Sequence, residues 1–106
     1  MALVEITVIP LGTGSTSLSD YVAGCLKVLE QSEGVKYQLT PMGTVIEGDL
    51  PIIMGIIANM HEQPFLAGAS RVSTTIRIDD RRDKEGTMES KVLAVQNKII
   101  RPGGTD

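Results

Sequence analysis

Residues 35–51 read VKYQLTPMGTVIEGDLP and decide the fold, because they contain a strand, a turn, a second strand and the start of a helix. Residues 35–40 alternate between apolar and polar side chains, which is the period of a strand with one buried face. Pro41-Met42-Gly43 is a turn signal, since proline fixes one φ angle and glycine permits a positive one. The link to the next strand, residues 44–47, is so short that the two strands must form an antiparallel hairpin.

The hairpin is flanked by two predicted helices. After it, Asp49 can cap a helix that accepts Pro51 in its first turn and ends before Pro64 or shortly after it. Before it, a helix begins near Ser17 and stops at Gly34. Each helix carries one apolar stripe at helical spacing: Leu18, Val22, Cys25, Leu26 and Leu29 in the first, and Ile53, Ile56, Ile57 and Met60 in the second.

Two more strands and a last helix complete the chain. Residues 2–9 are rich in β-branched residues, and residues 71–79 alternate cleanly. Thr87 can cap the last helix, whose apolar stripe is Met88, Val92, Val95 and Ile99. This order predicts an α+β, ferredoxin-like βαββαβ sandwich with an extra C-terminal helix. We expect one domain over residues 1–100 and a frayed tail over residues 101–106.

The predicted sheet has one face without a helix. Both long helices cover the same face, and we expect that face to be full. The other face carries mostly polar side chains: Glu5, Thr7, Lys36, Gln38, Thr40, Ser73, Thr75 and Arg77. The stripe of the last helix must also be covered, so both features favour an oligomer of this chain. A polar sheet face that meets water is the alternative.

Composition excludes several classes of partner. The net charge of −3 argues against nucleic acid, which needs a basic surface, and three aromatic residues without tryptophan offer no platform for stacking bases. No apolar run approaches the length of a membrane span. Cys25 is the single cysteine, so no intrachain disulfide can form, and no signal peptide is recognisable. We therefore expect a cytoplasmic protein.

No catalytic or metal-binding pattern is present in the sequence. His61 is the only histidine and has no partner placed by sequence, so a triad cannot be argued. Cys25 lies on an apolar stripe, as a core thiol does. The run at residues 79–85 alternates acids and bases, without the regular oxygen ligands and central glycine of a calcium loop. We predict no enzyme, no metal and no cofactor.

The loop at residues 10–17 reads PLGTGSTS and lies between a strand and a helix N-terminus. Free backbone N–H groups at such a position can bind anions. The loop lacks the lysine of a P-loop and the full Gly-x-Gly-x-x-Gly spacing, so it is a weak phosphate signal. Its hydroxyl groups suit a neutral or cationic polar ligand.

Three segments together resemble the YkoF-like thiamine-binding proteins, in their short, single-domain branch. They are residues 3–13 with the serine-rich residues 15–19, residues 39–48 (LTPMGTVIEG) and residues 71–83 (RVSTTIRIDDRRD). The resemblance extends from residue 2 to about residue 100. It implies a ferredoxin-like fold, dimers or tetramers built through the sheets, and binding of thiamine or its hydroxymethylpyrimidine part without catalysis.

The resemblance also implies a set of ligand contacts. They are Thr13, Ser15, Ser17, Thr40, Met42, Gly43, Thr44 and Glu47. An aminopyrimidine presents a donor amine and ring acceptors, which hydroxyl groups and a carboxylate can pair, and Glu47 is the expected partner of the amine or a ring nitrogen. With one copy of the fold, a complete site can require two subunits. The alternative function is a structural or regulatory oligomeric module without a small ligand of its own.

Overall fold

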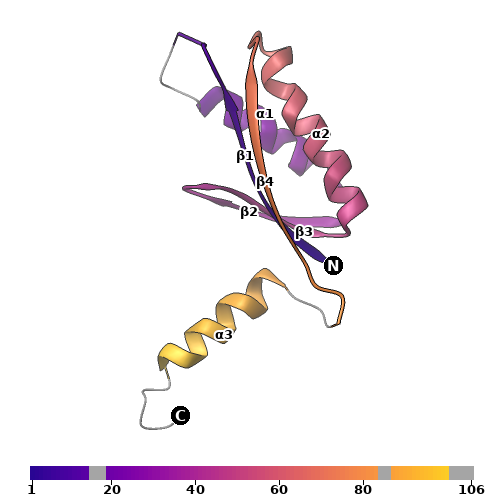
Figure 1. The fold of residues 1–106 in the computed structure, drawn as a ribbon, viewed down its shortest axis with the longest axis vertical. Helices are drawn as coiled ribbons and strands as arrows, with labels where there is room; N and C mark the ends of the chain where they lie inside the picture. Colours follow the sequence, from indigo (N-terminus) through magenta and orange to yellow (C-terminus); the bar gives the residue numbers. More distant parts are fainter. Residues whose placement is uncertain (15–18, 84–86, 101–106) are drawn as a thin grey trace.

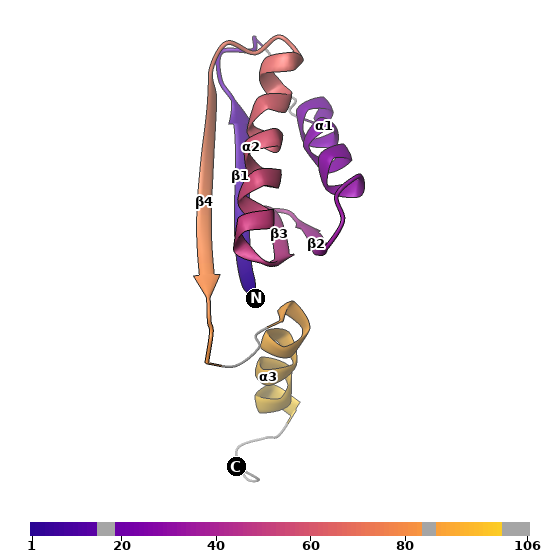
Figure 2. The same cartoon turned by 90° about the vertical axis from the view of Figure 1, so that its right-hand side faces the viewer.

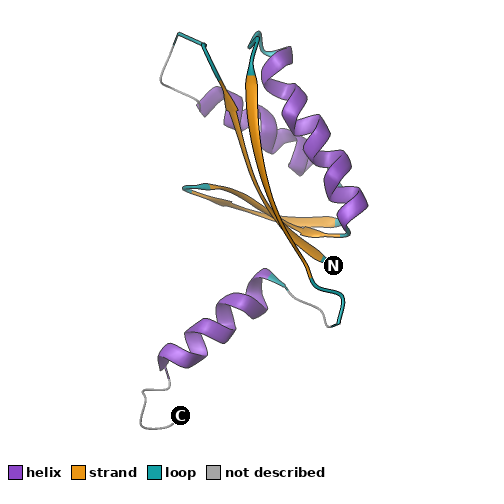
Figure 3. Cartoon of the chain, in the orientation of Figure 1, coloured by secondary structure: helices purple, strands orange, loops and turns teal. Residues whose placement is uncertain are grey.

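The structure is a computed structural model that describes residues 1–14, 19–83 and 87–100. Strands and helices follow the predicted order (Figures 1 and 3). The elements are β1 (Ala2–Pro10), α1 (Ser19–Glu30), β2 (Val35–Thr40), β3 (Gly43–Gly48), α2 (Leu50–Leu66), β4 (Val72–Asp80) and α3 (Met88–Ile100). The ferredoxin-like α+β fold with one extra helix is therefore confirmed. The predicted tail at residues 101–106 lies outside the described residues.

The four strands form one antiparallel sheet in the order β2-β3-β1-β4. β1 pairs with β4 along its whole length, Ala2–Pro10, but with β3 only over Ala2–Ile6. β3 is shorter because the chain has just made the tight turn at Pro41-Met42. The C-terminal half of β1 therefore has a neighbouring strand on one side only, and this gap in the sheet positions the candidate site.

Both long helices lie on one face of the sheet, as Figure 2 shows from the side. The core joins Val4, Ile6 and Ile46 of the sheet to the two helices. The stripe predicted for α2 is buried in full, and in α1 Cys25, Val28 and Leu29 are the buried residues. Burying an aliphatic side chain of this size stabilises the fold by roughly 1.5–3 kcal/mol. The helix face of the sheet is thus the hydrophobic core.

The expectation that two helices fill this face was wrong at β4. Ile76 and Ile78 point to the helix side of the sheet, opposite Ile6 and Val4, yet they are 39% and 44% exposed. β4 is an edge strand, and the helices pack mainly over the central strands. An apolar strip on β4 therefore remains half uncovered.

Hydrogen bonds between residues close in sequence define the C-terminal end of α2 and the N-terminal end of α3. α2 continues through Pro64 to Leu66, and the N–H of Ala67 donates to the Gln63 carbonyl at 3.1 Å. α3 is capped as predicted, because the Ser90 N–H donates to Thr87 Oγ1 at 2.9 Å. The predicted start of α1 near Ser17 lies outside the described residues.

α3 projects away from the rest of the domain (Figures 1 and 2). The radius of gyration is 16.5 Å, whereas a compact domain of this length has about 13 Å. Val92, Val95 and Ile99 of its apolar stripe are all more than half exposed. These three residues are thus left largely uncovered by the described part of the chain.

Candidate ligand-binding pocket

A cavity of about 570 Å³ opens where β3 ends beside β1, beneath α1 and next to the β2–β3 turn. Cavities of a few hundred Å³ with apolar walls are typical of small-molecule sites. The lining comes from four places in the sequence: residues 6–9 of β1; Ser19, Val22, Ala23, Cys25 and Leu26 of α1; residues 39–44; and Met60 of α2. None of the described residues that line it carries a charge.

The turn at one side of the cavity is held by its own hydrogen bonds. Thr40 Oγ1 donates to the Gly43 carbonyl at 2.8 Å and accepts from the Met42 N–H at 3.3 Å. Thr7 Oγ1 donates to the Met42 carbonyl at 3.2 Å, which ties the turn to β1. Thr40 therefore shapes the cavity wall, while the side chain of Met42 is largely exposed at the turn.

Gly43 permits the close approach of this turn to β1. Its φ angle is +151°, and a Cβ placed on it would lie 2.8 Å from Thr7 Oγ1 and 2.9 Å from the Ile6 carbonyl oxygen. Real Cβ contacts do not come so close, and other residues rarely adopt this backbone conformation. A glycine is thus required where the turn meets the strand.

Thr44 supplies a buried hydroxyl group to the cavity. Its side chain is 7% exposed and lies on the helix side of the sheet, opposite Ile6. The hydroxyl makes no hydrogen bond to another residue in the described part of the chain. The hydroxyl belongs to a residue that lines the cavity and can both donate and accept a hydrogen bond, so Thr44 is a natural contact for a ligand.

Cys25 lies in the cavity wall as a buried thiol, as predicted. Its Sγ donates to the Met60 carbonyl at 3.5 Å. Burial raises the pKa of this thiol above its ordinary value. The group is therefore protonated at neutral pH and contributes an apolar surface rather than a nucleophile.

Glu47 is not brought together with the other predicted contacts. It lies three residues after Thr44, and since side chains alternate along a strand, it points to the open face of the sheet, beside Leu3 and Lys36. It is only 4% exposed, and its Oε1 has no hydrogen-bond partner among the described residues. Glu47 is thus a buried carboxylate on the far side of the sheet from the cavity.

Three predicted contacts, Thr13, Ser15 and Ser17, come from the loop after β1. Thr13 is half-buried in the loop after β1 and does not line the cavity. Ser15 and Ser17 lie outside the described residues. Of the eight predicted contacts, the cavity collects four, namely Thr40, Met42, Gly43 and Thr44.

The apolar residues of the cavity were not predicted as contacts, and Val8, Val22, Leu26 and Met60 are among them. Three of these lie on predicted helical stripes or next to them, where core packing explains them equally well. One signal in the sequence does point here: the strand at residues 2–9 is longer than the strand predicted at residues 44–47. A long strand beside a short one leaves a free edge.

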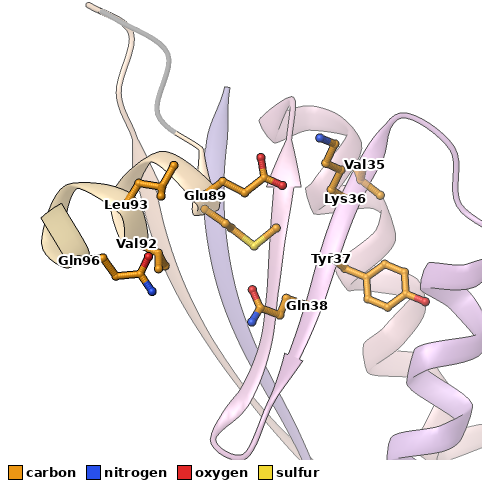
Figure 4. Close-up of a pocket in the computed structure, with 9 residues that line it drawn as sticks. Val35, Lys36, Tyr37, Gln38, Glu89, Val92, Leu93 and Gln96 are labelled. Atoms are coloured by element: carbon orange, nitrogen blue, oxygen red, sulfur yellow. The ribbon is translucent and has the colours of Figure 1, made fainter. Parts of the chain in front are cut away.

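A second, wider groove of about 760 Å³ separates α3 from β2. Figure 4 shows Val92 and Leu93 of α3 and Gln38 of β2 around it. Residues 35–38 of β2 line one wall, and Met88, Glu89, Val92, Leu93 and Gln96 of α3 line the other. The groove lies between the projecting helix and the edge of the sheet.

The described part of the charged run, residues 79–83, pairs partly within itself, as predicted, whereas Asp79 pairs with Lys91 of α3. Arg81 binds Asp83 through two hydrogen bonds of 2.6 and 3.0 Å, and Arg82 binds Asp80 at 2.9 Å. The hydrogen bond from Arg82 lowers the pKa of the Asp80 carboxyl group. Within residues 1–14, 19–83 and 87–100, no group of three or more metal-binding side chains is present, and no helix is long and apolar enough to cross a membrane.

The fold is that of a ferredoxin-like domain, and its described lining residues enclose an uncharged cavity. The family described as thiamine-binding protein matches residues 4–96. The chain therefore belongs to the thiamine-binding protein family, which confirms the resemblance seen in the sequence. The description of that family names binding and no reaction.

Individual relatives cover the whole domain. The UPF0045 protein YqgV of Bacillus subtilis is 53% identical over 105 residues, which span 96% of this chain and 100% of the relative. The crystal structure of the protein MJ1052 from Methanocaldococcus jannaschii superposes with a TM-score of 0.81 at 37% identity, over 90% of this chain and 95% of that one. A domain of unknown function, DUF77, from Bacillus cereus superposes with a TM-score of 0.79 at 26% identity, over 92% and 91%.

Proposed function

We propose that this protein binds thiamine or its hydroxymethylpyrimidine part without catalysing a reaction, and that the cavity beneath α1 is the binding site. The cavity carries the proposal, because it joins an apolar volume of about 570 Å³ to the turn segment that the family resemblance assigns to the ligand. Membership of the thiamine-binding protein family supports thiamine as the ligand.

The pyrimidine half suits the cavity better than the other half of thiamine does. Thiamine joins a neutral aminopyrimidine to a positively charged thiazolium ring. No charged side chain lines the cavity among the described residues, so a buried thiazolium would lack a counter-ion. We therefore place the pyrimidine inside, against Ile6, Leu26 and Met60, with the thiazolium towards solvent near Met42.

Calorimetric titration of ligand-free protein with thiamine and with hydroxymethylpyrimidine tests this proposal. Thr44→Val removes a hydroxyl from the cavity lining and keeps the shape of the side chain, so it should weaken binding roughly twofold to tenfold, which is the range for one neutral hydrogen bond. Glu47→Gln is the matched control on the opposite face of the sheet and should bind as the wild type does. Loss of binding in Glu47→Gln alone would move the site to the open face.

Failure of both ligands to bind would remove the thiamine proposal. Native mass spectrometry first establishes that the protein is ligand-free. Saturable heat should then be accompanied by a higher melting temperature, because a ligand that binds only the folded state stabilises it. No heat and no thermal shift would favour the structural or regulatory module instead.

We also propose that the protein assembles from copies of itself. The exposed stripe on α3 and the half-exposed Ile76 and Ile78 on β4 are apolar surfaces that a second copy would cover. The groove between α3 and β2 gives such a copy a concave surface to enter (Figure 4). Sedimentation that shows only an 11.4 kDa species at micromolar concentration would refute assembly.

A further inference from the structure

The free edge of β1 faces the candidate pocket. β4 pairs with β1 over Ala2–Pro10, while β3 pairs with it only over Ala2–Ile6. Along an antiparallel strand, successive residues direct their N–H and C=O groups alternately towards the neighbouring strand on one side and the neighbouring strand on the other. Each second residue of β1 after Ile6 therefore directs its N–H and C=O towards the side where β3 has ended.

Three observations decide which residues these are. The Leu11 N–H donates to the Arg71 carbonyl at 2.8 Å, in the same register that pairs β1 with β4, so odd-numbered residues bond to β4. The Ile6 carbonyl oxygen would lie 2.9 Å from a Cβ on Gly43, so this even-numbered residue faces β3. Pro10 is also even-numbered, and its missing N–H is tolerated because it points away from the ladder with β4.

Val8 is the even-numbered residue between Ile6 and Pro10. No described residue of β3 stands opposite it, because the ladder with β3 ends at Ile6–Thr44. Val8 lines the cavity together with its neighbours Thr7 and Ile9. Its N–H and C=O therefore border the cavity as a donor and an acceptor that no described strand residue pairs, an arrangement that favours a ligand able to pair both.

The N–H and C=O of Val8 favour a ligand that presents an acceptor and a donor side by side. In an extended residue the N–H and C=O point the same way, so a donor lies beside an acceptor. A ring with an amino group next to a ring nitrogen presents the complementary pair, and a 4-aminopyrimidine has this edge. With the 5-substituent of the ring directed towards Met42, as proposed above, the ring meets this edge in one orientation only. In that orientation a 4-oxopyrimidine presents an oxygen and a ring N–H, which reverses both positions.

We propose that the N–H and C=O of Val8 bind the ring nitrogen and the adjacent amino group of the pyrimidine, so that the pocket selects 4-aminopyrimidines over 4-oxopyrimidines. The inference rests on the proposed function and goes further by naming the recognised edge. Thr44 lies opposite Ile6, one step along the same face, and lines the cavity, so its hydroxyl can bind a third polar group of the ligand.

The first test uses the unmodified protein and two ligands that differ at one position. 4-Amino-5-hydroxymethyl-2-methylpyrimidine and its 4-oxo analogue are titrated calorimetrically, and we expect the oxo analogue to bind at least about a hundredfold more weakly, since buried partners would be left unpaired. In ¹⁵N-labelled protein the Val8 amide resonance should move on saturation with the amino compound.

A pair of variants separates the backbone from the side chain. Val8→Pro removes the N–H without removing a bond to β4, and Val8→Ala keeps the N–H but truncates the side chain. The proline variant should lose at least about tenfold more affinity than the alanine variant. Should Val8→Pro not fold, the ligand pair and the amide resonance decide the question by themselves.

The outcomes distinguish this inference from the proposed function. Equal affinity for the amino and oxo compounds, or a Val8 amide unmoved at saturation, would overturn the recognition by Val8 and leave thiamine binding standing. If neither compound nor thiamine binds, the proposed function fails and the inference fails with it.

Discussion

Replacing Gly43 by alanine should destabilise the domain far more than its size suggests. The added Cβ would lie 2.8 Å from Thr7 Oγ1 and 2.9 Å from the Ile6 carbonyl oxygen, at a φ angle of +151°. Strain at such a backbone conformation costs about 1–3 kcal/mol, and a forced contact with backbone costs about 1–3 kcal/mol more. Together these costs predict that Gly43→Ala loses roughly 2–6 kcal/mol of unfolding free energy.

Gly55→Ala is the matched control for this substitution. Gly55 lies inside α2, and a Cβ on it would meet nothing within 4 Å. Alanine should stabilise the helix there by about 0.5–1 kcal/mol, because glycine has the lower helix propensity. The two variants therefore carry the same chemical change and should shift stability in opposite directions.

Urea unfolding at one fixed protein concentration measures both changes. The concentration must be fixed because assembly would add to the apparent stability. An unfolding midpoint that falls for Gly43→Ala with an unchanged slope reports a loss of stability alone. A Gly43→Ala protein within about 0.5 kcal/mol of the wild type would show that the turn does not approach β1 as closely as described.

Three further predictions follow from burial, exposure and titration. Val92→Asp should shift the sedimentation coefficient towards a single chain, since it places a charge on the exposed stripe, whereas Asp83→Ala should leave assembly unchanged; equal behaviour would exclude α3 from the interface. Ile53→Ala, at a fully buried core position, should cost about 2–5 kcal/mol in urea unfolding, whereas Ile52→Ala on the exposed side of α2 should cost well under half of that. Burial raises the pKa of Cys25, so the contribution of its thiol to stability is present below the unfolded-state pKa and is lost as the pH rises through the folded-state pKa. The melting temperature should therefore fall less above about pH 9 in Cys25→Ala than in the wild type. Identical pH profiles of the two proteins would contradict this.

Much of the candidate site could be predicted from the sequence, and the rest depended on which face each strand residue occupies. Thr40, Met42, Gly43 and Thr44 lie in and beside one tight turn, which keeps them together at one end of the cavity. Glu47 is close in sequence but lies on the opposite face, because three steps along a strand reverse the side of the sheet.

The sequence by itself determined the order of the elements, the hairpin at its centre, the stripe of α2 and the family, because each is carried by neighbouring residues. Tertiary structure alone decided where the cavity lies and which backbone groups border it. The free edge at Val8 exists because β4 continues along β1 where β3 does not, and those pairings join residues more than 35 positions apart. Registers of this kind are set by the packing of distant strands against a shared core, which no local pattern records.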